Sequence, residues 1–167
     1  MRDELTKVDI QKMKEEIEYR KGVLAPQLRS AVKSARELGD LSENDEYRSA
    51  KRELNRNNSR IHYLQAMIDT AVVISAESKN DEVGLFDRVE IVYENDGESR
   101  EIRIVTTLRN NVFQNCISKE SPLGAALLGK KAGERVMVKV NEKVQYPVLI
   151  KSIVKGEDDE SLDISKY

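Results

Sequence analysis

The sequence predicts an α+β protein in two parts, a long antiparallel helical hairpin followed by a small antiparallel β-sheet domain with one short helix. Apolar residues recur at helical spacing up to residue 74, and their spacing falls to two after residue 87. Charged residues make up 35% of the chain, against about 25% in an average protein, so much of the chain must be surface. We expect the hairpin over residues 1–75, a linker over 76–84, the sheet domain over 85–155 and a frayed acidic tail over 156–167.

The two helices of the hairpin each carry an apolar repeat. The second helix alternates steps of three and four residues, which predicts a coiled-coil seam whose register the polar Asn57 sets. Thr6 and Asp9 supply a capping box for the first helix, and Pro26 should kink it or interrupt its hydrogen bonds. The first repeat is Ile10, Ile17, Leu24, Ala31 and Leu38, with Met13, Leu28 and Ala35 between them, and the second is Tyr47, Ala50, Leu54, Asn57, Ile61, Leu64, Ile68 and Ala71.

The connection between the helices is short. Gly39 can end the first helix in the left-handed conformation, and Ser42 can cap the second. So short a turn cannot join parallel helices, so residues 37–43 form the tip of an antiparallel hairpin. A hairpin that buries its own seam favours a monomer.

The second half of the chain has the alternating apolar pattern that is typical of β-strands. We expect strands at 88–94, 100–106, 136–140 and 146–150, with Pro147 at an edge or a strand start. A short helix should begin at Ser121-Pro122 and end at Gly129.

Composition excludes several classes of protein. The 28 Lys and Arg residues nearly balance 30 Asp and Glu, which argues against a protein that coats nucleic acid or a membrane surface. Cys116 is the only cysteine and His62 the only histidine, which excludes disulfide frameworks, zinc clusters and Ser-His or Cys-His catalysis. With neither an export signal nor an apolar run of about 20 residues, we expect a cytoplasmic protein with no membrane partner.

Four carboxylates gather at the tip: Asp40, Glu43, Asp45 and Glu46. Acidic residues complement the dipole of a helix's first turn, and Ser42 with Asp45 can form a capping box, so three of the four have a structural interpretation. Asp40 precedes the cap and has none. The functional hypothesis is that Asp40 and Glu43 hold Mg²⁺, which prefers oxygen ligands. Two exposed carboxylates are too few for a tight site, so the metal would be shared with a partner enzyme's two-metal centre.

The shaft behind the tip is basic. Arg48, Arg52, Arg56 and Arg60 repeat every four residues, and the first helix adds Arg29, Lys33 and Arg36. Either this stripe is a solvated flank balanced by Glu37 and Glu53, or it faces nucleic acid.

Two long motifs resemble the GreA/GreB family of bacterial transcript cleavage factors, with GreA the closer. Residues 35–51 (ARELGDLSENDEYRSAK) are similar to the family's hairpin tip, and residues 118–133 (SKESPLGAALLGKKAG) to its Ser-Pro-Leu-Gly segment. The resemblance implies an amino-terminal coiled coil and a carboxy-terminal FKBP-like domain. It further implies that the factor docks at the rim of bacterial RNA polymerase, inserts its coiled coil into the secondary channel and stimulates cleavage of backtracked nascent RNA.

The resemblance also implies residue roles. Asp40 and Glu43 would help hold a Mg²⁺ of the polymerase near the RNA 3′ end, so the factor would bind no cofactor stably and would not itself be an enzyme. The residues that support the tip would be Arg36, Leu41, Ser42, Asn44 and Tyr47, and those of the polymerase-docking loop would be Ser121, Pro122, Leu123 and Gly124. Independently of the resemblance, the basic stripe gives the residues expected to face RNA or polymerase as Arg48, Arg52 and Arg56.

Departures from the family pattern leave rival functions open. Asp45 stands where the family usually has a small residue, and related factors with extra tip acids inhibit the polymerase, so a secondary-channel inhibitor is the alternative. A prolyl isomerase would need an aromatic-lined pocket, for which the second half has few aromatic residues. If the protein were only a coiled-coil adaptor, neutralising the tip carboxylates would not change its activity.

Overall fold

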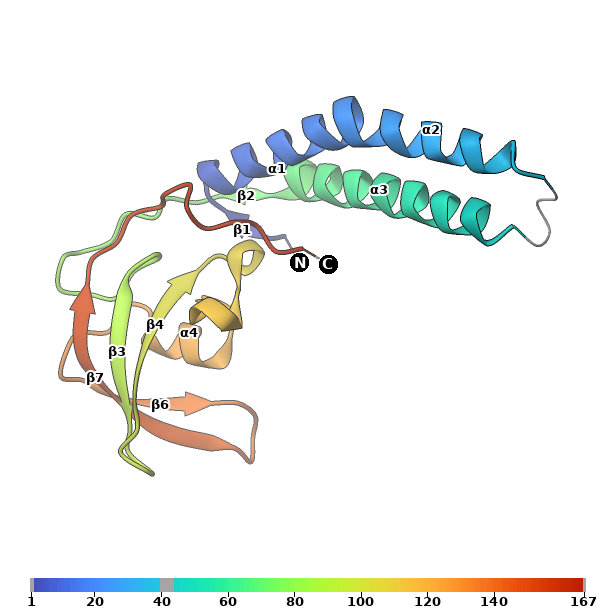
Figure 1. Cartoon of the computed structure of the whole chain (residues 1–167). Helices are drawn as coiled ribbons and strands as arrows, with labels where there is room; N and C mark the ends of the chain where they lie inside the picture. The colour runs from blue at the N-terminus through green and yellow to red at the C-terminus, as the bar shows by residue number, and fades with distance from the viewer. Residues whose placement is uncertain (1, 40–43, 167) are drawn as a thin grey trace. The chain divides into compact units, whose positions relative to one another are not determined.

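The structure is a computed structural model that describes residues 2–39 and 44–166. The chain forms two compact units, a hairpin unit of residues 10–71 and a β-domain unit in which residues 3–9 join residues 72–167. Figure 1 shows the helices of the first unit and the curled sheet of the second. The predicted α+β fold class is confirmed.

The hairpin unit is a pair of long antiparallel helices (Figure 1). The first helical arm consists of α1 (Lys7–Tyr19), the π-helical turn η1 (Arg20–Leu24) and α2 (Ala25–Arg36). The second arm is α3 (Asp45–Thr70). The predicted capping box starts α1, because the Thr6 amide donates to Asp9 Oδ2 at 3.0 Å and the Asp9 amide donates to Thr6 Oγ1 at 3.2 Å. Beyond the end of α2, Gly39 has a φ of 131°, a backbone conformation that glycine adopts more readily than other residues.

The π-turn corrects the seam that the sequence predicts for the first helix. Pro26 lies in the first turn of α2 and does disturb the helical ladder, since the Ala25 amide reaches back five residues to the Arg20 carbonyl. After this turn the buried and half-buried positions are Ala25, Leu28, Val32 and Ala35, so Leu28 and Ala35 keep their predicted places while Val32 lies on the seam instead of Ala31. The predicted seam residues Ala31 and Leu38 are therefore exposed, Leu38 to 69%.

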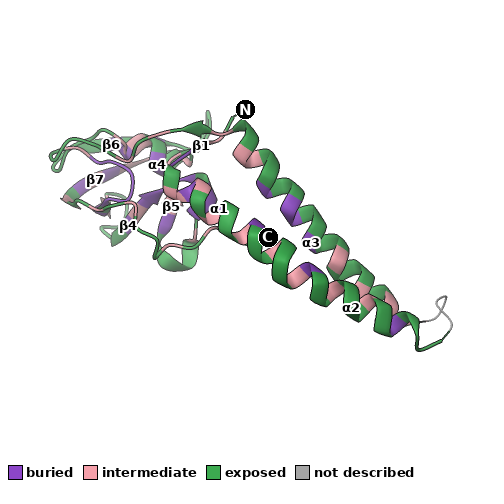
Figure 2. Cartoon of the chain, turned by 90° about the horizontal axis from the view of Figure 1, so that it is seen from above, coloured by how far each residue is buried: buried purple, intermediate pink, exposed green. Residues whose placement is uncertain are grey.

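The seam of α3 follows the prediction. Every residue of its repeat is buried or half-buried, and Figure 2 shows the buried positions along one side of each helix. Asn57 is 2% exposed and lies against the π-turn. It donates from Nδ2 to the Arg20 carbonyl at 3.3 Å, and its Oδ1 accepts from Arg20 Nη1 at 3.1 Å. These bonds tie one residue of α3 to one turn of the facing helix, which fixes the register.

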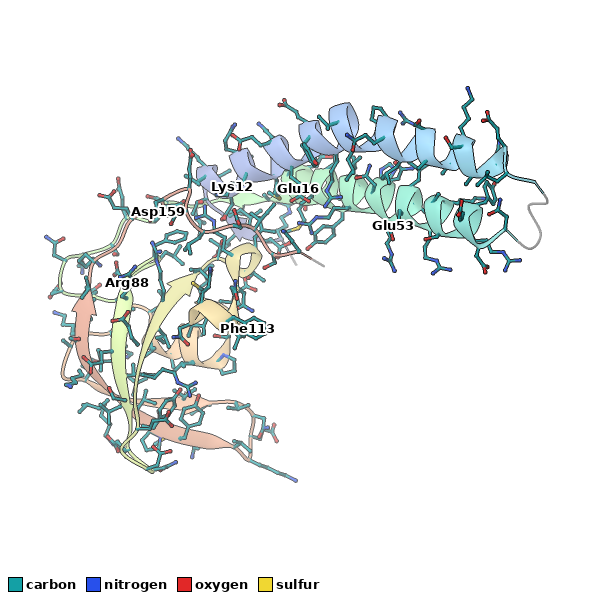
Figure 3. All side chains as sticks on the ribbon, in the orientation of Figure 1. Lys12, Glu16, Glu53, Arg88, Phe113 and Asp159 are labelled. Atoms are coloured by element: carbon teal, nitrogen blue, oxygen red, sulfur yellow. The ribbon has the colours of Figure 1, made fainter. Side chains whose placement is uncertain are left out.

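A buried ion pair crosses the same seam. Arg60 of α3 donates from Nε and Nη2 to the two carboxylate oxygens of Glu16 at 2.9 and 3.2 Å (Figure 3). Arg20 adds a third bond to Glu16 at 2.7 Å. Burial alone would raise the pKa of Glu16, but the bonds from Arg60 and Arg20 outweigh it and hold that pKa below its usual range.

The β-domain is built on a five-stranded sheet in the order β5-β4-β3-β7-β6. The predicted strands form antiparallel pairs β3–β4, β3–β7 and β7–β6. One pairing departs from the predicted antiparallel sheet, because β5 runs parallel to β4 at the edge. The intervening turns η2 (Thr107–Arg109) and η3 (Val112–Gln114) carry the chain back so that Cys116, the first residue of β5, pairs with Arg103 within β4. The strands are β3 (Arg88–Tyr93), β4 (Ser99–Val105), β5 (Cys116–Ser118), β6 (Arg135–Lys139) and β7 (Gln145–Val154).

The remaining elements complete the β-domain core. The short helix α4 (Pro122–Leu127) begins at the predicted cap Ser121 and is followed by Gly129 with a φ of 76°. Pro147 is near a strand start as predicted, being the third residue of β7. A two-residue parallel pair, β1 (Glu4–Leu5) with β2 (Val72–Val73), was not predicted. The core contains Phe86, Ile91, Ile104, Leu127 and Ile150, all with no exposed surface.

The prediction of a frayed acidic tail is wrong. Arg109 has no exposed side-chain surface, and its Nη2 lies 2.7 Å from Asp158 Oδ1 while Nη1 donates to the Asp159 carbonyl at 3.0 Å. The same guanidinium donates from Nε to Asp9 Oδ1 at 2.6 Å and stacks on the Phe86 ring. A buried arginine requires carboxylate partners, and the tail supplies one of them, so its acidity is structural.

Candidate functional site at the hairpin tip

Asn44 anchors the tip end of α3. Its Oδ1 accepts from the Tyr47 amide at 3.0 Å, which makes Asn44 the N-cap of α3. The prediction that Ser42 caps this helix is therefore wrong: α3 begins at Asp45, three residues beyond Ser42. Asn44 Nδ2 also donates to the Ala35 carbonyl in the last turn of α2 at 2.7 Å. One side chain thus caps α3 and ties it to the end of the facing helix.

Tyr47 forms a second link between the helices. Arg36 of α2 donates from Nη2 to the Tyr47 hydroxyl at 3.3 Å, and its guanidinium lies 5.5 Å from the ring centroid. The Lys51 ammonium lies 5.8 Å from the same ring. The hydrogen bond from Arg36, aided by the charges of Lys51 and Arg36, lowers the pKa of the Tyr47 phenol although its side chain is in contact with water. Sequence reasoning missed Lys51, for which the four-residue spacing from Tyr47 was the available signal.

The structure describes two of the four tip carboxylates, those of Asp45 and Glu46. Asp40 and Glu43, predicted to share the metal, lie outside the described residues, as do Leu41 and Ser42. Asp45 and Glu46 form the first turn of α3, where both are exposed and complement the helix dipole. No group of three or more metal-ligating side chains occurs within residues 2–39 and 44–166.

The basic stripe is shorter than the sequence suggests. Arg48, Arg52 and Arg56 are exposed on α3, with Arg56 donating to Glu53 at 3.1 Å. Arg60 is buried against Glu16 instead. A four-residue step advances about 40° beyond a full helical turn, so three steps rotate Arg60 onto the seam.

The predicted docking loop is a fixed turn at the start of α4. Ser121 Oγ accepts from the Gly124 amide at 3.1 Å and donates to the Ser118 carbonyl at 2.6 Å. A Cβ at Gly124 would lie 2.2 Å from that carbonyl, so only glycine fits. Pro122 is exposed, while Leu123 packs partly against the core.

A further exposed element of the β-domain was missed. Phe113 is fully exposed on η3, and Val112 beside it is 74% exposed (Figure 3). The turn is fixed, because Asn111 Oδ1 accepts from the Phe113 amide at 3.1 Å and Asn115 closes the turn with a φ of 54°. An apolar pair within the amide-rich sequence 110–115 was the available signal. An exposed aromatic side chain on a fixed turn is typical of protein-binding surfaces.

In the described part of the chain, no helix has the length and apolar character needed to cross a membrane.

Comparison with known proteins places this geometry in a family. Residues 4–73 match the family model described as transcription elongation factor, N-terminal, and residues 77–155 match that of transcription elongation factor, GreA/GreB, C-term. The chain is 40% identical over 146 residues to the transcription elongation factor GreA of Thermotoga sp. (strain RQ2), covering 87% of this chain and 94% of the relative. It is 42% identical to that of Thermosipho africanus, covering 87% and 93%.

Among solved structures, GreA factor homolog 1 of Thermus thermophilus is similar at 25% identity and a TM-score of 0.41, covering 93% of this chain and all of that one. The GreA/GreB factor of Nitrosomonas europaea is similar at 22% identity and a TM-score of 0.39, covering 62% and 87%. The two family models together cover residues 4–73 and 77–155, and so include most of both units. The chain belongs to the GreA/GreB family of transcription elongation factors.

Proposed function

We propose that this chain binds bacterial RNA polymerase, inserts its hairpin into the secondary channel and stimulates the polymerase's own cleavage of backtracked nascent RNA. The carboxylates of Asp40 and Glu43 act at the polymerase active site, near the RNA 3′ end. The factor is an accessory protein and the polymerase is the catalyst. Family membership supports the polymerase as partner, and the tip supplies the mechanism.

The observation that carries the proposal is the anchoring by Asn44. Its two hydrogen bonds, to the Tyr47 amide and the Ala35 carbonyl, hold the end of α2 against the start of α3. The bond between Arg36 and Tyr47 is a second tie between these two helices. Because the two helix ends are already held together, little of their conformational freedom is lost when the tip meets a partner, which lowers the entropic cost of assembling the site.

The donor set at the tip fits Mg²⁺ only as part of a shared site. Asp40 and Glu43 offer hard carboxylate oxygens, the ligand type that Mg²⁺ prefers, but two carboxylates fill only part of six-fold coordination. The metal belongs to the polymerase, where it would activate water and stabilise charge on the phosphate being cleaved. The task of this chain is to carry the two carboxylates there.

The β-domain supplies the docking contacts. The fixed turn Ser121–Gly124 and the exposed pair Val112–Phe113 are rigid features of its surface. Rigid apolar anchors bind with little loss of side-chain entropy. Cleavage then depends on two separable parts, docking by the β-domain and chemistry at the tip.

The second candidate is an inhibitor of the same channel, which Asp45 favours because it is exposed directly beside the tip. Its place in the first turn of α3 already gives Asp45 a structural role. We therefore rank stimulation of cleavage first.

The test is RNA cleavage in backtracked bacterial elongation complexes. We expect the wild-type factor to accelerate cleavage, and Asp40→Asn with Glu43→Gln to abolish the acceleration while polymerase binding, measured by competition, is retained. Glu46→Gln is the matched control, because it removes an exposed carboxylate from the first turn of α3, three residues after Glu43 in the sequence, and should leave cleavage unchanged. Equal loss of binding and cleavage would refute the metal role. Slower cleavage with wild type that Asp45→Ala relieves would establish the inhibitor.

A further inference from the structure

A pocket of about 320 Å³ opens on one side of the hairpin, where the π-turn η1 faces α3. We call it the shaft pocket. The small side chain of Ala25 and the apolar Ile61 form its buried base. Its rim consists of four polar side chains: Lys21 from η1, Arg29 from α2, and Asn58 and His62 from α3. The pocket exists because the extra residue of η1 brings Ala25 onto the seam, leaving room that a larger residue would fill.

The rim is electrostatically one-sided. Lys21 and Arg29 are cations, Asn58 is a neutral donor, and the imidazole of His62 can offer a ring N–H donor. No carboxylate lines the pocket in the part of the chain that the structure describes. Several donors that converge on a single concave surface without an acceptor form a complement to an anion.

The rim side chains also lack the partners that their neighbours have. One turn away, Glu16, Arg20, Asn57 and Arg60 satisfy one another through five hydrogen bonds. Lys21, Arg29, Asn58 and His62 form no side-chain hydrogen bond or ion pair with another described residue. At this level of the hairpin, the charged and polar seam residues satisfy one another. The side chains around the shaft pocket have no such partners among the described residues.

We propose that the shaft pocket binds a phosphate group, carried either by an RNA strand or by a free nucleotide. Arg29 supplies a planar fork of donors that suits a tetrahedral oxyanion, Lys21 adds charge, and the side chains of His62 and Asn58 add N–H donors. The pocket lies behind the tip and shares no side chain with the Asn44 and Tyr47 contacts. Phosphate binding there is independent of the cleavage activity proposed above.

The direct test is a two-dimensional NMR titration of the full chain with sodium sulfate, at constant ionic strength set by sodium chloride. Sulfate is a tetrahedral dianion and stands in for a phosphate group. We expect saturable shifts of the Ala25, Arg29, Asn58 and His62 amides.

Variants separate a site from general charge screening. Arg29→Gln and His62→Gln should each weaken sulfate binding about tenfold, the low end of the effect of losing one hydrogen bond to an anion. Lys139→Gln is the matched control, since it removes one exposed positive charge from β6 of the other unit, and binding should be unchanged. Shifts that do not saturate, or an equal weakening by Lys139→Gln, would overturn the proposal.

Two further probes identify the source of the phosphate. A 5′-phosphorylated ribotrinucleotide is compared with the same trinucleotide lacking the terminal phosphate, which keeps only its two internal phosphodiesters, and with a nucleoside triphosphate. Binding of the phosphorylated trinucleotide in preference to the triphosphate assigns the pocket to RNA, and the reverse preference assigns it to a free nucleotide. Equal binding of both trinucleotides with no shift at Arg29 would contradict a phosphate site.

Discussion

Removing Arg60 should destabilise the hairpin far more than removing an exposed arginine of α3. Glu16 is held by Arg60 through two bonds and by Arg20 through one. Breaking a buried ion pair from one side costs about 3–5 kcal/mol because the other charge remains buried. Arg20 stays behind as a partner, so for Arg60→Met we expect the low end of that range, about 3 kcal/mol. The matched control Arg56→Met, at a side chain that is 71% exposed, should change stability by less than about 0.5 kcal/mol.

The double variant Glu16→Met/Arg60→Met separates charge burial from packing. Replacing both members of a buried pair with apolar residues is often neutral or stabilising, so the double variant should recover most of the loss. The measurement is urea unfolding followed by helical circular dichroism at 222 nm. A cost below about 1 kcal/mol for Arg60→Met, or additive costs in the double variant, would refute the buried-pair account.

The same pair predicts a pH dependence. The pKa of Glu16 in the folded protein lies below its ordinary value of 4.5, so the unfolded chain binds more protons in the interval between the two. The stability from the pair is therefore fully present above about pH 5 and is lost as pH falls through the lowered folded pKa. Wild type should lose more stability than Arg60→Met when pH is reduced from neutral to acidic. Parallel losses in the two proteins would contradict the assignment.

Three other predictions follow from particular contacts. Val32→Glu should cost about 2 kcal/mol, the value of burying a valine, while Ala31→Glu should be nearly neutral; the reverse order in thermal melts would contradict the shifted seam. Asn44→Ala should cost about 1–2 kcal/mol of stability and reduce cleavage stimulation, while polymerase affinity is retained. Asn44→Asp should keep the helix cap but lose the hydrogen bond to the Ala35 carbonyl. Unaltered cleavage with Asn44→Ala would show that the anchor is dispensable. Gly124→Ala should force the backbone at Ser118 to move and cost about 1–3 kcal/mol, while Ala125→Ser, at an exposed position of α4, should leave the melting temperature unchanged.

The sequence predicted the elements that depend on local chemistry. The capping box of Thr6 and Asp9, the seam of α3 and the Ser121 cap are all recognisable from residue type and spacing, because the interactions join residues three or four apart. The π-turn was harder to predict. Pro26 signalled a disturbance in the first helix, but whether a proline produces a kink or an inserted residue depends on the facing helix, where Asn57 binds the Arg20 carbonyl.

Long-range charge pairing was beyond sequence reasoning. The acidic tail resembles a solvated segment by composition, and only the fold brings Asp158 to Arg109, which also binds Asp9. Arg60 resembled a member of an exposed stripe until the helical rotation placed it opposite Glu16. At the tip, the family resemblance singled out Asn44 and Tyr47 as supporting residues, and the structure supplies their partners, Ala35 and Arg36.

The measurement that tests the central claim most directly is the Mg²⁺ dependence of RNA cleavage in backtracked complexes saturated with wild-type or Asp40→Asn factor. If Asp40 contributes a ligand to the shared metal, the variant should need a higher Mg²⁺ concentration for half-maximal cleavage, and added Mg²⁺ should restore part of the rate. An unchanged Mg²⁺ requirement with a lower maximal rate would contradict a metal-holding role for the tip.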